Sequence, residues 1–152
     1  MRTTKRYGRK TDLALSLWVK LARASATFGH RTLDDIRLYG LTQPQFGVLE
    51  SLGHLGEVTL GELSRKTLSS CGNITVVVDN LEKEGLVLRR HSREDRRVIH
   101  VQLTPKGKKL FTTIFPRHAR CIVSLASVLT EEEQEHLGSL LKKLGTSLAA
   151  PV

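Results

Sequence analysis

The stretch NITVVVDNLEKEGLV, residues 73–87, decides the fold of this chain. Its apolar residues recur at positions i, i+3, i+4 and i+7, which is the spacing of one helix face. They are Ile74, Val77, Val78 and Leu81. We expect a helix over about residues 71–84 that buries this face and ends at Gly85, because glycine readily adopts the left-handed conformation that stops a helix.

The opposite face of this helix is small and polar near its start. Thr75 and Val76 lie there, whereas the acids Asp79, Glu82 and Glu84 come only in the later turns. The positive end of the helix dipole also favours an anion near the first turn. A phosphate backbone could therefore approach the first two turns of this helix.

Downstream of Gly85 the helical period gives way to alternation, with β-branched runs at 86–91 and 97–103 around a short polar loop. This pattern is typical of an antiparallel hairpin. Five arginines fall within it, more than a hairpin needs for solubility: Arg89, Arg90, Arg93, Arg96 and Arg97. Clustered arginines bind phosphates by releasing condensed counterions, and a solvated surface is the ordinary alternative.

Upstream, two capping boxes predict helix starts. Thr42-Gln43-Pro44-Gln45 opens one helix, and Thr59-Leu60-Gly61-Glu62 opens a short one that ends near residue 67. Residues 68–70 are typical of a tight turn, with two serines whose hydroxyls can cap the next helix.

Long amphipathic helices are expected at both ends of the chain. The first covers about residues 10–32. Another begins at Pro105, which suits the first helical position, and Pro116 inside it removes a backbone donor, so we expect a kink or two segments there. A third capping box at Thr130 opens a final helix with a stripe of leucines: Leu137, Leu140, Leu141, Leu144 and Leu148.

Helix, helix, turn, helix and charged hairpin follow one another in the order of a winged helix-turn-helix. In that arrangement the helix after the turn enters the major groove of DNA, and the hairpin, or wing, reaches along the backbone. We therefore predict a mainly α fold with a small β-hairpin wing and added helices from both termini. The terminal helices exceed what one small winged domain needs to cover, so each stripe serves either the core of the chain or an interface with a second copy.

Several separated motifs resemble, in order, the MarR family of bacterial regulators. They are residues 73–87, Asp95-Arg96-Arg97, Val101-Gln102-Leu103-Thr104-Pro105-Lys106-Gly107, and the helix starts near Thr42 and Thr130. The resemblance covers about residues 12–145. It implies a single MarR-type chain over residues 1–152, with dimerisation helices at 10–40 and 105–148 and the winged helix-turn-helix at 41–104.

The resemblance also implies a function. Such proteins are two-fold homodimers that bind a pseudo-palindromic operator in double-stranded DNA, usually as repressors. They often release DNA when a small aromatic or phenolic ligand binds between the dimerisation and DNA-binding parts. For this ligand we consider Trp18, His30 and Phe46, each of which is otherwise an ordinary core residue.

Carried over by position in the motifs, eight residues are expected at the DNA. They are Ser69, Ser70, Asn73, Thr75 and Val76 around the recognition helix, and Arg93, Asp95 and Arg97 in the wing. Arg97 matches the wing-tip arginine that enters the minor groove, and Asp95 would orient it by a charge-assisted hydrogen bond. The alternatives are that the two serines only cap the helix and that Asp95 is a surface acid.

Composition agrees with a polyanionic partner. The 152 residues carry 24 Lys and Arg against 15 Asp and Glu, a formal net charge of +9. No apolar run approaches the roughly 20 residues of a membrane span, and two cysteines are too few to scaffold a chain of this length. The basic start is not followed by the apolar segment and cleavage site of a signal peptide, so we expect a cytoplasmic protein.

Other functions have less support. Six scattered histidines form no tight ligand pair with either cysteine, so we expect no metal and no cofactor. Without a glycine-rich phosphate loop or a nucleophile beside a base, we expect no enzyme. Two alternatives remain: a winged-helix module for protein contacts, and a thiol-responsive regulator acting through Cys71, which lies near basic residues in the first turn of a helix or simply fills that turn.

Overall fold

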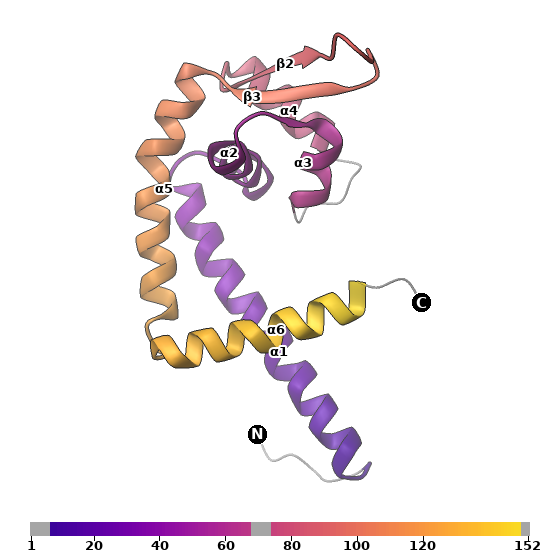
Figure 1. Ribbon diagram of the computed structural model, residues 1–152. Coiled ribbons are helices and arrows are strands. Elements are labelled where there is room, and N and C mark those ends of the chain that lie inside the picture. Colours follow the sequence, from indigo (N-terminus) through magenta and orange to yellow (C-terminus); the bar gives the residue numbers. More distant parts are fainter. Residues whose placement is uncertain (1–6, 68–73, 150–152) are drawn as a thin grey trace. The chain divides into compact units, whose positions relative to one another are not determined.

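The computed structural model describes residues 7–67 and 74–149 (Figure 1). It divides the chain into two compact units, residues 1–118 and 119–152. The described part is mostly helical and carries one small antiparallel sheet, which confirms the predicted mainly α fold with a hairpin wing. None of its helices is long and apolar enough to cross a membrane.

The helices and strands follow the predicted order along the chain. They are α1 (Arg9–Arg37), α2 (Gln43–Leu55), β1 (Val58–Thr59), α3 (Leu60–Lys66), α4 (Ile74–Lys83), β2 (Val87–His91), β3 (Ile99–Leu103), α5 (Pro105–Ala126) and α6 (Glu131–Ala149). α1 continues five residues beyond the predicted end near residue 32, because Ile36 in its last turn is buried in the core.

All three predicted capping boxes form. At α2 and α6 the amide of the cap threonine donates to the side chain three residues later, and the amide of that residue donates to the threonine hydroxyl, at 2.9–3.4 Å. At α3 the amide and the hydroxyl of Thr59 donate to Oε2 of Glu62 at 2.9 and 2.8 Å. These bonds, the backbone one first, hold the pKa of the Glu62 carboxyl below its ordinary value.

The sheet has the strand order β1-β3-β2. β2 and β3 form the predicted hairpin, with Arg89 opposite Val101 and Arg90 opposite His100. β1, which pairs with β3, was not predicted, because it is only two residues long and too short to show a period. Because side chains alternate along a strand, Arg89 and Arg90 point to opposite faces of the sheet.

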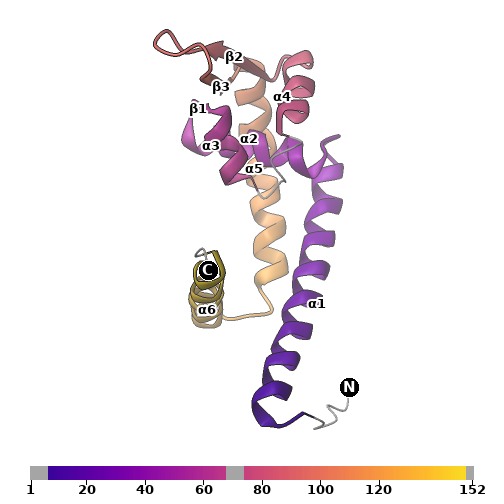
Figure 2. The same ribbon diagram turned by 90° about the vertical axis from the view of Figure 1, so that its right-hand side faces the viewer.

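The core of the first unit lies between α2, α3, α4 and the inner face of the sheet. α4 packs against both α2 and β2 (Figure 2). The predicted stripe of α4 is buried: Ile74, Val77, Val78 and Leu81 are at most 6% exposed. This burial fixes which face of α4 remains on the surface.

The start of α5 is tied closely to the turn between α4 and β2. The Thr104 hydroxyl donates to the Gly85 carbonyl at 2.7 Å, and Nζ of Lys106 donates to the Glu84 carbonyl at 2.6 Å. A Cβ atom on Gly107 would lie 1.9 Å from the carbonyl oxygen of Leu86. Glycine is therefore required at this crossing of helix and strand.

α5 is one continuous helix through Pro116, so of the two expected alternatives, a kink or two segments, the two segments are ruled out. Proline removes one backbone donor, and that local cost is opposed by packing on both sides of it. Phe111, Ile114 and His118 are all buried along the same helix. Tertiary contacts thus hold the helix through a residue that disfavours it.

The second unit contains the end of α5 and all of α6. Three glutamates in the first turn of α6 suit the positive end of its dipole. The predicted leucine stripe is present on α6 but exposed, with Leu140 at 51% and Leu144 at 36%. On α1, in the first unit, the apolar side chains of Leu13 and Leu17 are exposed as well.

Candidate DNA-binding interface

The outer face of α4 is open to solvent. Its first turns present Thr75 and Val76, and the Val76 side chain is 52% exposed although it is apolar. No acid lies in the first turn of α4, and Asp79 and Glu82 follow one and two turns later. The side chains at the start of α4 are small enough for a ligand to approach the helix closely, and none of those in its first turn is acidic.

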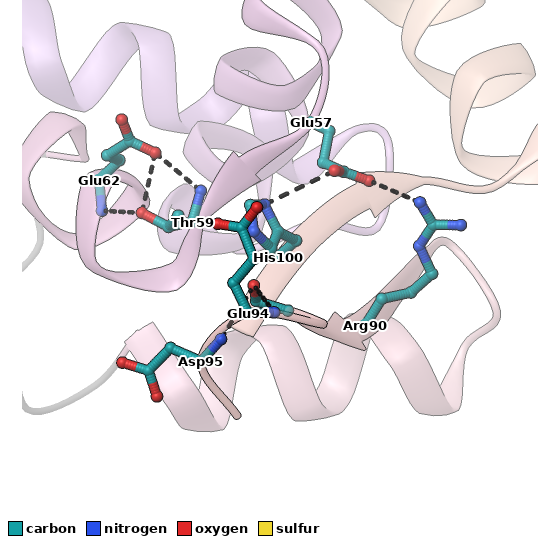
Figure 3. Close-up of polar contacts among 8 residues, drawn as sticks. Glu57, Thr59, Glu62, Arg90, Glu94, Asp95 and His100 are labelled. Atoms are coloured by element: carbon teal, nitrogen blue, oxygen red, sulfur yellow. Dashed lines mark hydrogen bonds and ion pairs between the residues drawn. The ribbon is translucent and has the colours of Figure 1, made fainter. Parts of the chain in front are cut away.

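The wing loop between β2 and β3 is organised by its own side chains. The Ser92 hydroxyl accepts hydrogen bonds from the amides of Glu94 and Asp95 at 3.2 and 3.4 Å. Oδ1 of Asp95 accepts from the amide of Arg97 at 2.9 Å, and the Val98 amide donates to the Asp95 carbonyl at 2.9 Å. Glu94 and Asp95 lie at the turn of the hairpin in Figure 3.

Asp95 therefore acts on the backbone of Arg97. The Asp95 carboxylate was expected to accept a hydrogen bond from the Arg97 guanidinium, but it accepts one from the Arg97 amide instead. Among the described residues no carboxylate lies within ion-pair distance of Arg93, Arg96 or Arg97, and all three arginines are exposed. The wing tip therefore presents three exposed arginines that form no ion pair within the described part of the chain.

The two arginines of β2 have acidic partners. Arg90 lies 3.5 Å from Oε2 of Glu57, and His100 lies 3.5 Å from the other oxygen of the same carboxylate (Figure 3). Glu57, the residue before β1, thus links Arg90 of β2 to His100 of β3 on the outer face of the hairpin. Arg89, on the inner face, is paired with Asp79 of α4.

A cleft of about 440 Å³ separates the wing from α3 and the start of α4. Arg97 and Val98 line it from the wing, Ser64 from α3 and Ile74 from α4. The wing and the start of α4, the latter through Ile74 of its buried stripe, thus border a common depression.

Four of the residues predicted from the sequence fall outside the described residues. They are Ser69, Ser70, Cys71 and Asn73.

The three candidates for a ligand site differ in their exposure. Trp18 and His30 are exposed on α1, where His30 lies 3.8 Å from Asp34. Phe46 is buried on α2, with its ring centroid 4.5 Å from that of His118. Among the described residues, no three His, Cys, Asp or Glu side chains come together as metal ligands do.

Sequence reasoning did not single out Arg89, Glu57 or the pair Asp35 and His118. Arg89 pairs with α4 because of the way the hairpin packs, and no spacing in the sequence indicates which face of the hairpin turns toward that helix. Asp35 and His118 are 83 residues apart in sequence, so only packing brings them together.

The short helix α3, the exposed face of α4 and the basic hairpin define a winged helix-turn-helix protein of the DNA-binding class. Comparison with known proteins narrows this class. Residues 41–99 match the MarR family model. The chain is 41% identical over 135 residues to the HTH-type transcriptional regulator MhqR of Bacillus subtilis, covering 89% of this chain and 93% of that protein.

Solved structures agree on the fold. Sco3205, a MarR family transcriptional regulator from Streptomyces coelicolor solved in complex with DNA, superimposes with a TM-score of 0.84 at 20% identity and covers 98% of this chain and 94% of its own. Bordetella bronchiseptica BpsR, whose structure concerns regulation of DNA binding by 6-hydroxynicotinic acid, has a TM-score of 0.77 at 26% identity and covers 86% and 98%. The chain belongs to the MarR family of DNA-binding transcriptional regulators.

Proposed function

We propose that this chain is a homodimeric repressor that binds a pseudo-palindromic operator through α4 and the wing, and that a small aromatic or phenolic ligand releases it. The observation that carries the proposal is the exposed, acid-free start of α4 beside a wing tip whose three arginines have no ion-pair partner among the described residues. The same proposal assigns DNA binding to residues 41–104, action in the cytoplasm, and no catalytic step.

At the DNA, the first turns of α4 enter the major groove. Thr75 and Val76 then contact base edges, where a thymine methyl is the apolar partner that suits them, together with Asn73, which can pair with adenine. Ser69 and Ser70 bond phosphates at the start of the helix. Phosphate contacts set the register, and base contacts select the sequence.

The wing supplies the second contact. Arg97 enters the minor groove, where the negative potential favours a guanidinium, and Arg93 neutralises a flanking phosphate. Asp95 and Ser92 hold the loop in its turn without neutralising Arg97. This division leaves the whole charge of Arg97 available to DNA.

Dimerisation is supported by the two exposed apolar stripes. On α1, Leu13, Leu17 and Trp18 are 58–65% exposed, and on α6 the leucines are 36–77% exposed. Contiguous apolar faces of this kind are typical of interfaces between subunits. A second copy, using the helices within residues 10–40 and 105–148, is the partner that a two-fold operator requires.

An aromatic or phenolic effector is supported by the similar protein BpsR, whose DNA binding is regulated by 6-hydroxynicotinic acid, a hydroxylated aromatic acid. Trp18, His30 and Phe46 remain the candidate contacts. Aromatic acids and phenols should therefore raise the thermal midpoint and weaken DNA binding.

The deciding experiment is fluorescence anisotropy on duplex DNA from upstream of the protein's own gene, across a salt series and against unrelated competitor DNA. We expect competitor-resistant binding at two chains per site. Arg97→Ala should weaken binding to every operator variant and lower the salt slope by about one, whereas Asn73→Ala should cost about 1–3 kcal/mol mainly on the cognate sequence.

Two results would favour the alternatives. Weak binding that any DNA abolishes, with affinity and slope unchanged in Arg97→Ala, would favour a winged-helix module for protein contacts. An operator affinity that falls with oxidant in the wild type but not in Cys71→Ser would favour thiol control through Cys71.

A further inference from the structure

Arg89 joins the wing to the recognition helix by several bonds at once. Its guanidinium pairs with the Asp79 carboxylate, and Nη2 donates to the carbonyl of Thr75 at 2.9 Å. Nη1 lies 3.5 Å from Oε2 of Glu82, and the backbone amide of Arg89 donates to the other oxygen of that carboxylate at 3.0 Å. One strand residue thus contacts three successive turns of α4.

The acids that Arg89 contacts lie on the helix that faces DNA. The side chains of Asp79 and Glu82 are 41% and 40% exposed, so each carboxylate is open to solvent and to an approaching phosphate. A negative charge there would repel the DNA backbone. The Arg89 side chain, only 20% exposed, compensates that charge from the protein side.

The same contacts hold the first turn of α4 in place. The carbonyl of Thr75 already belongs to the helix ladder, and Nη2 of Arg89 gives it a second donor. Thr75 and its neighbour Val76 are the described residues that we assign to base contacts. A guanidinium suits this position because its planar fork can donate to a carboxylate and a carbonyl at the same time.

We propose that Arg89 is a positioning residue for DNA binding, which compensates Asp79 and fixes the first turn of α4 against the wing. The inference rests on the proposed operator binding and adds a residue that does not itself touch DNA. Arg89 acts through Asp79 and Thr75, in contrast to Arg93 and Arg97 at the wing tip.

The fold does not depend on Arg89 alone. β2 and α4 are also joined by apolar packing in the core, where Leu81 of α4 and Val87 of β2 are each no more than 1% exposed. Replacing Arg89 by glutamine keeps much of its aliphatic stem and removes only the charge and the fork. We therefore expect Arg89→Gln to fold, as circular dichroism and a thermal melt will verify.

The test is a double-mutant cycle of Arg89→Gln and Asp79→Asn, measured by anisotropy on duplex DNA from 50 to 300 mM salt. Over this range the Debye screening length falls from about 14 to about 6 Å. Arg89→Gln should bind about tenfold more weakly at the lowest salt, because one carboxylate is left uncompensated, and the deficit should shrink as salt rises. Adding Asp79→Asn should restore most of the affinity. A loss of packing alone would give a deficit independent of salt and no rescue.

Arg90→Gln is the matched control. It removes the same charge one residue along, on the face of the sheet that meets Glu57. Asp79→Asn should rescue Arg89→Gln and leave the affinity of Arg90→Gln unchanged. Equal rescue of both variants, or wild-type affinity in Arg89→Gln, overturns the inference.

Arg89→Lys keeps the charge but not the fork, so it should lose less affinity than Arg89→Gln, and it serves as the test if Arg89→Gln unfolds. An equal or greater loss in folded Arg89→Lys overturns charge compensation. Failure of the proposed function is distinct, since then the wild type itself would show no operator preference. If the wild type binds and Arg97→Ala weakens it while the Arg89 variants bind normally, only the role of Arg89 fails.

Discussion

Nδ1 of His118 lies 2.7 Å from Oδ2 of Asp35, and the side chains of both residues are at least 86% buried. The other carboxylate oxygen accepts a hydrogen bond from the Tyr39 hydroxyl at 3.2 Å. The ring of Phe46 packs against the imidazole. This polar cluster joins the end of α1 to α5 and α2 at the edge of the core.

Removing one member of the cluster should destabilise the protein. Asp35→Ala leaves the buried His118 imidazole without its carboxylate partner, so we expect a loss of about 3 kcal/mol in the free energy of unfolding, measured by urea denaturation. Asp34→Ala is the control on the same helix, because its partner His30 is 70% exposed, and it should cost no more than about 0.5 kcal/mol. Similar losses in the two variants would contradict a structural role for the buried pair.

Gly107→Ala should destabilise the first unit by about 1–3 kcal/mol, because its methyl group would overlap the Leu86 carbonyl. Gly47→Ala makes the same change inside α2, where nothing lies within 4 Å of the added Cβ atom. It should raise stability by about 0.5–1 kcal/mol, since alanine loses less backbone entropy in a helix. Thermal melts of both variants will show whether the signs differ as predicted.

The Glu62 cap predicts a specific pH dependence. Its folded-state pKa lies below the ordinary value of 4.5, so the stabilisation by the carboxylate is present above that pH and is lost as the pH falls through the folded pKa. Glu62→Gln keeps the capping pattern without the charge. The midpoint difference between wild type and Glu62→Gln should be largest near neutral pH and decline below pH 4.5.

Thr59→Ala provides the control for this cap. It removes the hydroxyl that bonds the Glu62 carboxylate, so in that background the pH-dependent part of the difference should be smaller. A difference that stays constant between pH 7 and pH 3 would show that the charge of Glu62 contributes nothing to stability.

The dimer proposal predicts that Leu140→Glu weakens self-association at least about tenfold, because it replaces an apolar contact by a charge in both copies of a two-fold interface. Lys142→Glu places the same side chain off the leucine stripe of α6 and should leave the dimer intact. Sedimentation velocity over a concentration series distinguishes the two. Unchanged association in Leu140→Glu would remove the stripe from the interface.

Local signals in the sequence predicted most of the fold. The buried face of α4 follows from the spacing of Ile74, Val77, Val78 and Leu81, because residues three and four apart share a helix face. The capping boxes span only three residues, and the hairpin is marked by alternation within each strand. Each of these signals involves residues that are close together in the sequence, so a short stretch is enough to predict the element.

Pairings between distant segments were decided by tertiary structure. β1 exists because Val58 and Thr59 lie beside β3, and no period marks two residues. Asp35 meets His118 only because folding brings the end of α1 beside α5.

The sequence by itself determined the recognition helix, the wing and the charge that they carry. Only the tertiary structure decided that Arg89 meets Asp79 of α4 while Arg90 meets Glu57, since the packing of the hairpin sets which partner each face of β2 reaches. The physical reason is range. Propensity, capping and periodicity are local, whereas a salt bridge between elements depends on how those elements pack.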